Sequence, residues 1–138
     1  MKLGFIGCGN MGGALIGGIL EHRICSTSEI MASTPDQACA AGVREKYGIT
    51  VTPDNRQVAA SSQILVLAVK PQYYEEVIEE IRDQVADSAI VVSIAPGKTL
   101  EWLDMRFRRP LKLVRCMPST PALVGEYITE VCCNELVK

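Results

Sequence analysis

Short runs of apolar residues alternate along this chain with stretches in which apolar residues recur every three or four positions. The first pattern is typical of strands buried on both faces of a sheet, and the second of helices that pack one face against it. We expect strands at residues 2–6, 30–32, 49–52, 64–69, 89–94 and 111–117. We expect helices after the glycines that follow residue 6, at residues 37–47, after the turn at 53–55, at 73–85 and at 99–105.

This alternation predicts the fold class. Strand and helix in regular succession favour an α/β protein with a doubly wound, mostly parallel sheet and helices on both faces, which is a Rossmann-like fold. The 138 residues are enough for one such domain with its own hydrophobic core. The chain shows no internal repeat, linker or low-complexity segment before its last residues.

Composition and charge exclude several classes of protein. Hydrophobic residues make up 48% of the chain, so disorder is not expected. The net charge is −2 and the chain has no basic stripe, so we expect no nucleic-acid partner. The longest apolar run is too short to cross a bilayer and the start lacks the features of a signal peptide, so we expect no membrane partner. We interpret one acidic cluster, on the helix expected at 73–85, as a solvated face: Glu75, Glu76, Glu79 and Glu80.

The cysteines do not indicate a metal site. The six of them are scattered without a C-x-x-C pair, and His22 is the only histidine. A structural zinc site usually shows closely paired ligands, so we expect no bound metal. We expect the cysteines to be reduced and to serve as small apolar side chains. Reduced cysteines favour a cytoplasmic protein. The positions are Cys8, Cys25, Cys39, Cys116, Cys132 and Cys133.

The letters GCGNMG near the start fit the pattern G-x-G-x-x-G, between the first expected strand and the first expected helix. A dinucleotide-binding turn requires that context, and glycines that serve packing alone are the alternative. Gly7 would allow the tight turn, Gly9 would let the backbone approach a pyrophosphate, and Gly12 would let the helix pack closely on the strand. Backbone N–H groups near Asn10 and Met11 would then bind phosphate oxygens.

The end of the second expected strand bears on which dinucleotide binds. An NAD site usually has Asp or Glu there, whereas this strand ends in Ala32, Ser33 and Thr34. Hydroxyl groups can accept a 2′-phosphate, so we expect NADP. NAD stays an alternative, because no arginine adjoins the turn and Asp36 lies close by. Ordinary turn chemistry is the other interpretation of these residues.

Later strands end in loops at the same edge of the expected sheet, where ligands bind in open α/β folds. These loops hold Ala68, Val69, Lys70 and Pro71, then Ile94, Ala95, Pro96 and Gly97, and a third segment at residues 115–121 contains two prolines. None of them offers an acid–base pair or a serine–histidine–aspartate set. The catalytic residues therefore stay unknown, and we expect the cofactor to carry the chemistry.

Four segments in this order, GFIGCGNMGGALIGG, LAVKPQ, VVSIAPG and VRCMPSTPALVGE, resemble the N-terminal half of the pyrroline-5-carboxylate reductase family. The resemblance covers nearly the whole chain, and the last two segments are its most specific part. The chain departs from the family at Pro96, where alanine is frequent, and at Ser119, where asparagine is frequent.

The resemblance implies a site and a reaction. Residues Ile6 to Met11 would cradle the pyrophosphate, and Ser33, Thr34 and Asp36 would surround the adenosine ribose. Asn55 would contact the same end, and the loops at 68–71 and 94–97 would line the nicotinamide. The implied reaction is hydride transfer from NAD(P)H to the C=N carbon of 1-pyrroline-5-carboxylate, which gives L-proline.

Members of this family are about twice as long, and their helical second half forms the dimer and holds the substrate. We therefore assign residues 1–125 to an NAD(P)-binding domain and residues 126–138 to the start of the connection to a helical domain. We expect the intact enzyme to be a homo-oligomer built on a dimer, and this chain alone to bind NADP(H) without reducing substrate. The alternatives are a related imine, hydroxyacid or deazaflavin reductase, and a non-catalytic nucleotide-binding module.

Overall fold

The computed structural model describes residues 2–7, 10–23, 26–94, 99–108, 111–118 and 128–133 of the chain. Its elements follow the order that the apolar pattern predicts, with one additional strand near the end. The strands are β1 (Leu3–Ile6), β2 (Ile30–Ser33), β3 (Thr50–Thr52), β4 (Ile64–Leu67), β5 (Ile90–Ser93), β6 (Lys112–Pro118) and β7 (Ile128–Cys133). The helices are α1 (Asn10–Glu21), α2 (Gln37–Tyr47), α3 (Asn55–Ser61), α4 (Tyr74–Ile81) and α5 (Leu100–Phe107), with short 3-10 helices η1 (Thr27–Glu29) and η2 (Pro71–Tyr73).

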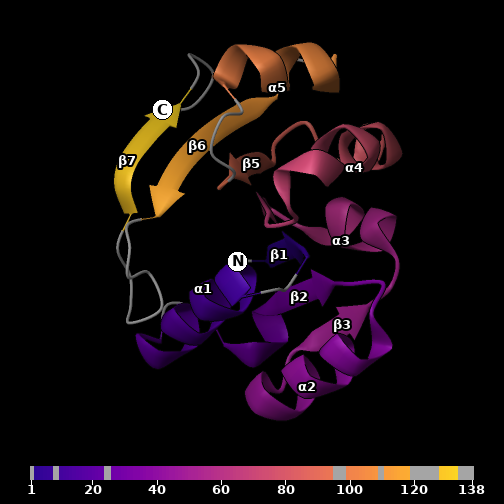
Figure 1. The fold of residues 1–138 in the computed structure, drawn as a ribbon, viewed down its shortest axis with the longest axis vertical. Helices are drawn as coiled ribbons and strands as arrows, with labels where there is room; N and C mark the ends of the chain where they lie inside the picture. The colour runs from indigo at the N-terminus through magenta and orange to yellow at the C-terminus, as the bar shows by residue number, and fades with distance from the viewer. Residues whose placement is uncertain are drawn as a thin grey trace.

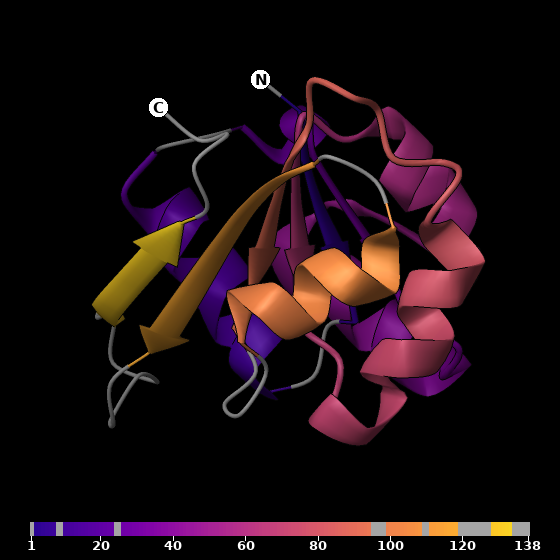
Figure 2. The same ribbon diagram turned by 90° about the horizontal axis from the view of Figure 1, so that it is seen from above.

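The strands form one sheet in the order β3-β2-β1-β4-β5-β6-β7. All neighbours from β3 to β6 are parallel, and β7 runs antiparallel to β6. The predicted doubly wound, mostly parallel sheet is therefore confirmed. No strand is predicted from the sequence at residues 128–133, yet β7 lies beside β6 at the outer edge of the sheet (Figure 2).

The helices form two layers, one on each face of the sheet (Figure 1). Connections between parallel strands are right-handed, so units that lead outward in opposite directions from the centre cover opposite faces. The chain moves from β1 to β3 through α1 and α2, and these two helices share a face. It then returns through α3 and moves outward through α4 and α5, which cover the other face.

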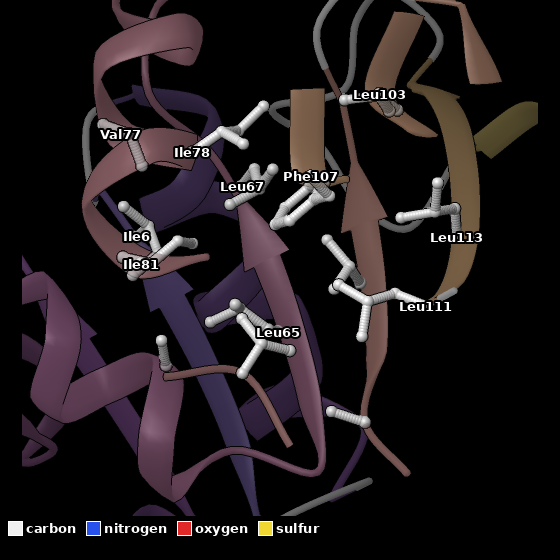
Figure 3. Packing of buried hydrophobic residues seen from close by; sticks show 14 of the residues in the cluster. Ile6, Leu65, Leu67, Val77, Ile78, Ile81, Leu103, Phe107, Leu111 and Leu113 are labelled. Atoms are coloured by element: carbon white, nitrogen blue, oxygen red, sulfur yellow. The ribbon is translucent and has the colours of Figure 1, made fainter. Parts of the chain in front are cut away.

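Alternate residues of the central strands supply two separate cores. Leu3 and Phe5 of β1 pack on the side of α1 and α2, whereas Ile6 packs on the side of α3, α4 and α5. The core on the side of α3, α4 and α5 is the larger one. Figure 3 shows its side chains from β1, β4, α4 and α5 meeting between sheet and helices. Burial of this apolar surface is the main stabilising contribution to the fold.

The helix ends have local causes in the sequence. Asp36, Asp54 and Thr99 cap α2, α3 and α5, because their side-chain oxygens accept hydrogen bonds from backbone N–H groups of the first turn. Gly48 adopts the left-handed conformation (φ 72°) that ends α2. The predictions for the helix at 37–47 and for the start of α5 after Thr99 are confirmed.

Two further properties concern the described ranges only. None of the helices there is long and apolar enough to cross a bilayer. Those residues also contain no group of three or more histidine, cysteine, aspartate or glutamate side chains that could hold a metal ion.

Candidate functional site

The candidate site lies where the sheet changes direction between β1 and β4. From this point the chain moves outward to β3 on one side and to β6 on the other. Such a switch point leaves a crevice outside the carboxyl ends of the strands, and ligands of open α/β folds bind there. Most of the residues predicted for the site follow the carboxyl ends of β1, β2, β4 and β5, and Asn55 begins α3 just after β3.

Gly7 makes the junction between β1 and β4 close enough to leave no room for a side chain. Its φ is +90°, a conformation that favours glycine. A Cβ atom built on Gly7 would lie 2.8 Å from Cγ1 of Val69 and 3.1 Å from the backbone N of the same residue. Two backbone hydrogen bonds join the end of β1 to the strands on either side of it. Gly7 N donates to Ser33 O at the end of β2 (2.9 Å), and Ala68 N, just after β4, donates to Ile6 O (2.8 Å). The tight turn predicted at Gly7 is thus part of the structure.

The first turn of α1 faces this edge. Asn10, Met11 and Gly12 begin the helix, and no acidic residue occurs in its first turn. The first N–H groups of a helix have no partner within it, so they are available to an anion. Two predicted residues of the turn, Cys8 and Gly9, lie outside the described residues.

At the end of β2, the hydroxyl groups of Ser33 and Thr34 have different surroundings. Ser33 is fully buried, and its hydroxyl donates to Oδ1 of Asn55 at 2.5 Å. Oγ1 of Thr34 accepts from the backbone N of Asp36 at 3.3 Å, which leaves the hydroxyl proton of Thr34 for another acceptor. Oδ1 of Asp36 accepts from the first N–H groups of α2, so this carboxylate serves as a helix cap. The structure therefore brings Ser33 and Asn55 together.

Asn55 links this edge to α4. Its Nδ2 donates to Oε1 of Glu80 at 2.7 Å. Nε of the following residue, Arg56, donates to the backbone oxygen of Glu80 at 3.3 Å. The four glutamates of α4 are exposed as expected, but Glu80 and also Glu75 contact neighbouring helices. Sequence reasoning missed this role of Glu80, because 25 residues separate it from Asn55.

The end of β4 contributes backbone rather than charge. Ala68 and Val69 are half-buried, whereas Lys70 is exposed and precedes Pro71, the first residue of η2. Beyond β5, Ile94 is buried in the core on the side of α1 and α2. The predicted residues Ala95, Pro96 and Gly97 lie outside the described residues.

A buried pair of hydroxyl groups joins the ends of β4 and β5. The hydroxyl of Tyr74 donates to the backbone oxygen of Leu67 at 2.6 Å, and Oγ of Ser93 donates to the Tyr74 hydroxyl at 3.1 Å. Tyr74 and Ser93 are fully buried. Sequence reasoning treated Tyr74 only as part of a helix, because its partners are distant in the sequence.

A surface hollow of about 770 Å³ lies elsewhere on the protein. Its lining includes Leu20 near the end of α1, Thr27 of η1 and Tyr47 at the end of α2. These segments meet at the amino-terminal ends of the strands, so the hollow is separate from the candidate site at the carboxyl ends.

The parallel sheet with its switch point and the close turn at Gly7 define the class: a Rossmann-type domain. A family model described as "NADP oxidoreductase coenzyme F420-dependent" matches residues 2–97. The chain belongs to this family, and within it the chain is a homologue of the N-terminal half of pyrroline-5-carboxylate reductases. The resemblance noted from the sequence is thereby confirmed.

Three relatives illustrate the similarity. The chain is 38% identical to pyrroline-5-carboxylate reductase of Escherichia coli strain K12, over 99% of the chain and 51% of that protein. A pyrroline-5-carboxylate reductase structure from Coxiella burnetii gives a TM-score of 0.90 at 30% identity, over 99% of this chain and 51% of that one. The Plasmodium falciparum pyrroline carboxylate reductase, solved with NADP bound, gives 0.86 at 30% identity, over 100% and 50%. The chain thus spans about half the length of the relatives it matches.

Proposed function

We propose that this chain binds NADP(H) as the cofactor-binding half of a pyrroline-5-carboxylate reductase. The observation that carries the proposal is the junction of β1, Gly7 and α1 at the switch point of the parallel sheet. A positive φ, a close approach to the end of β4 and a helix start that faces the crevice occur together there. This combination is what a dinucleotide pyrophosphate needs from a protein backbone.

The described residues fit such a ligand at its phosphates. The first turn of α1 offers backbone N–H groups and no negative charge. Ile6 packs its side chain into the core, so its contribution to the ligand is its backbone. The residues proposed to hold the pyrophosphate are Ile6, Gly7, Cys8, Gly9, Asn10, Met11 and Gly12.

The adenosine end of the proposed site lies beyond β2 and at the start of α3. Thr34 keeps a hydroxyl proton for a 2′-phosphate oxygen, and the Asp36 carboxylate is directed toward the backbone of α2. Both features favour NADP over NAD. The hydrogen-bonded pair Ser33 and Asn55 belongs to the same end of the proposed site. The nicotinamide would lie on the other side of Gly7, against residues 68–71 and 94–97.

The proposed reaction of the whole enzyme reduces 1-pyrroline-5-carboxylate to L-proline. When bound, NADPH would supply a hydride to the carbon of the protonated C=N bond, whose nitrogen already carries the proton, and the protein would orient the reactants and exclude water. The residues of this chain would orient the dinucleotide, while a helical second half of the longer protein would hold the substrate and form a dimer. The scattered positions of the six cysteines favour a cytoplasmic enzyme.

Titration of the 138-residue chain with NADPH and NADH tests the cofactor proposal. We expect saturable binding of both, with the smaller dissociation constant for NADPH. Equal constants would contradict the argument from Thr34, and no binding of either would contradict the proposal itself. The same chain should show no proline formation from 1-pyrroline-5-carboxylate, and measurable turnover would contradict the division of labour between the two halves.

A reductase of another imine or of a hydroxyacid, or one that uses a deazaflavin, is the second candidate. The description of the matching family model, which names coenzyme F420, favours the deazaflavin enzyme. The identity of 38% to a named pyrroline-5-carboxylate reductase favours the first candidate. Assays of the longer protein with each substrate and each reductant distinguish them.

A further inference from the structure

A line of hydrogen bonds leads from the buried end of β2 to the exposed face of α4. The Ser33 hydroxyl donates to Oδ1 of Asn55 at 2.5 Å, and Nδ2 of Asn55 donates to Oε1 of Glu80 at 2.7 Å. A second contact holds the same helices together, from Nε of Arg56 to the backbone oxygen of Glu80 at 3.3 Å. Glu80 therefore contacts the start of α3 twice.

The chemistry of these groups decides which way the Asn55 amide points. A serine hydroxyl can donate or accept, so Ser33 could pair with either end of an amide. An ionised carboxylate can only accept, so Glu80 requires the NH₂ group on its side. This fixes Oδ1 toward Ser33 and makes Ser33 the donor. Without the carboxylate, both orientations of the amide would satisfy Ser33.

The orientation has a consequence for a ligand at the carboxyl edge. Nδ2 carries two hydrogens, and only one of them points to Glu80. A phosphate group only accepts hydrogen bonds, whereas a ribose hydroxyl both donates and accepts. A fixed NH₂ group thus suits a 2′-phosphate, whereas an amide free to turn its oxygen outward suits a 2′-hydroxyl equally well.

We propose that Glu80 is a positioning residue for dinucleotide selection, which holds the Asn55 amide with its N–H group available to the 2′-phosphate of NADP(H). The inference rests on the proposed function, since it needs the adenosine ribose to lie near the end of β2. Glu80 acts through Asn55 and makes no contact with the ligand.

Glu80→Gln is the variant that tests this role in the 138-residue chain. Glutamine has the same shape and keeps a hydrogen bond to Asn55, but it can donate as well as accept, so it no longer fixes the amide. We expect the dissociation constant for NADPH to rise about two-fold, because the amide would present its NH₂ group in only about half of the molecules, while that for NADH stays unchanged. Simple charge repulsion between Glu80 and the 2′-phosphate predicts the opposite sign, namely tighter NADPH binding by the variant.

Glu75→Gln is the matched control. This variant removes a negative charge from the same helix as Glu80→Gln does. The Glu75 carboxylate, however, contacts Arg106 on α5, away from Asn55. We expect its ratio of NADH to NADPH dissociation constants to equal that of the unaltered chain. A merely structural role of Glu80 would lower the unfolding midpoint in urea and leave that ratio unchanged.

The outcomes separate this inference from the proposed function. If the unaltered chain binds neither dinucleotide, the proposed function fails and the role of Glu80 fails with it. If the unaltered chain prefers NADPH and Glu80→Gln keeps or strengthens that preference, only the role of Glu80 is overturned. A weaker preference in Glu80→Gln, with Glu75→Gln unchanged, supports it.

Discussion

Ser33 and Ser93 occupy equivalent places in the two halves of the sheet. Each is the last residue of its strand, β2 or β5, and each is fully buried. Each hydroxyl also donates to a side chain that comes from a helix on the face of α3, α4 and α5. Ser33 donates to Asn55, and Ser93 donates to Tyr74.

The two hydrogen-bond networks end in different surroundings. Tyr74 donates its hydroxyl proton to the buried backbone oxygen of Leu67, so these hydrogen bonds among the described residues lie within the core. Asn55 donates to the exposed carboxylate of Glu80, so the other network reaches the surface at the edge proposed for the ligand. The same pairing of strand-end serine and helix side chain therefore stabilises the fold in one half and can respond to a ligand in the other.

The largest effect is expected from Gly7→Ala, because the junction at Gly7 leaves no room for a side chain. Gly7 follows β1, which lies between the strands that carry the two networks. The new Cβ would meet Val69 at 2.8 Å in a backbone conformation that disfavours side chains. Overpacking and backbone strain should together lower the free energy of unfolding by about 3 kcal/mol. Urea unfolding followed by circular dichroism measures this loss, and NADPH titration should detect no binding.

Gly18→Ala is the control for this change. Gly18 lies inside α1, and apart from its chain neighbours and the nearby backbone of the helix itself, no atom of the described residues would lie within 4 Å of a Cβ built there. Alanine favours the helix over glycine by about 1 kcal/mol, so this variant should be at least as stable as the unaltered chain. Equal stability of the two alanine variants would show that the contact between Gly7 and Val69 does not constrain the junction.

The difference between the two glycines also shows what sequence reasoning can reach. Gly7 is recognisable from its place between an apolar strand and an apolar helix, because the whole pattern is local. The buried strands and the start of α5 after Thr99 are predictable for the same reason, whereas the role of Asp36 as the cap of α2 was not predicted. Local pattern thus predicts the sheet, the helices and the edge at which the site is proposed.

Contacts between distant segments could not be predicted in this way. Glu80 resembles any exposed glutamate of an amphipathic helix, and only the packing of α4 against α3 brings it to Asn55. The strand β7 escaped prediction because its pairing with β6, such as Cys132 opposite Arg115, depends on a partner outside its own segment. In both cases the missing information is which distant segments pack or pair with each other in the fold.

Tyr74→Phe tests the closed network. It removes the donor to Leu67 and the acceptor of Ser93 within a fully buried region. Buried polar groups that lose a partner typically cost about 2 kcal/mol, which is the decrease in unfolding free energy that we expect in urea. The ratio of NADH to NADPH dissociation constants should stay unchanged, because this network does not reach Asn55.

Tyr73→Phe is the neighbouring control, since the side chain of Tyr73 is 49% exposed. Its effect on the free energy of unfolding should stay within about 0.5 kcal/mol. A changed dinucleotide ratio in Tyr74→Phe would remove the distinction between the two networks.

The smallest effect is expected from Glu75→Gln, which concerns a contact with neither a buried end nor a link to the proposed site. Oε1 of Glu75 lies 3.0 Å from Nη1 of Arg106, and the two side chains are 57% and 35% exposed. Water and salt screen such a pair, so the free energy of unfolding should fall by at most about 0.5 kcal/mol. The guanidinium also lies 5.4 Å from the ring centroid of Trp102, which holds it in place without Glu75. Urea unfolding at low and high sodium chloride measures the effect, which should vanish at high salt because the pair is screened. A larger loss that persists in high salt would contradict this expectation. It would mean that an exposed contact of α4 stabilises the fold as much as the buried Tyr74 network does, so that burial would not decide how much a contact contributes to the free energy of unfolding.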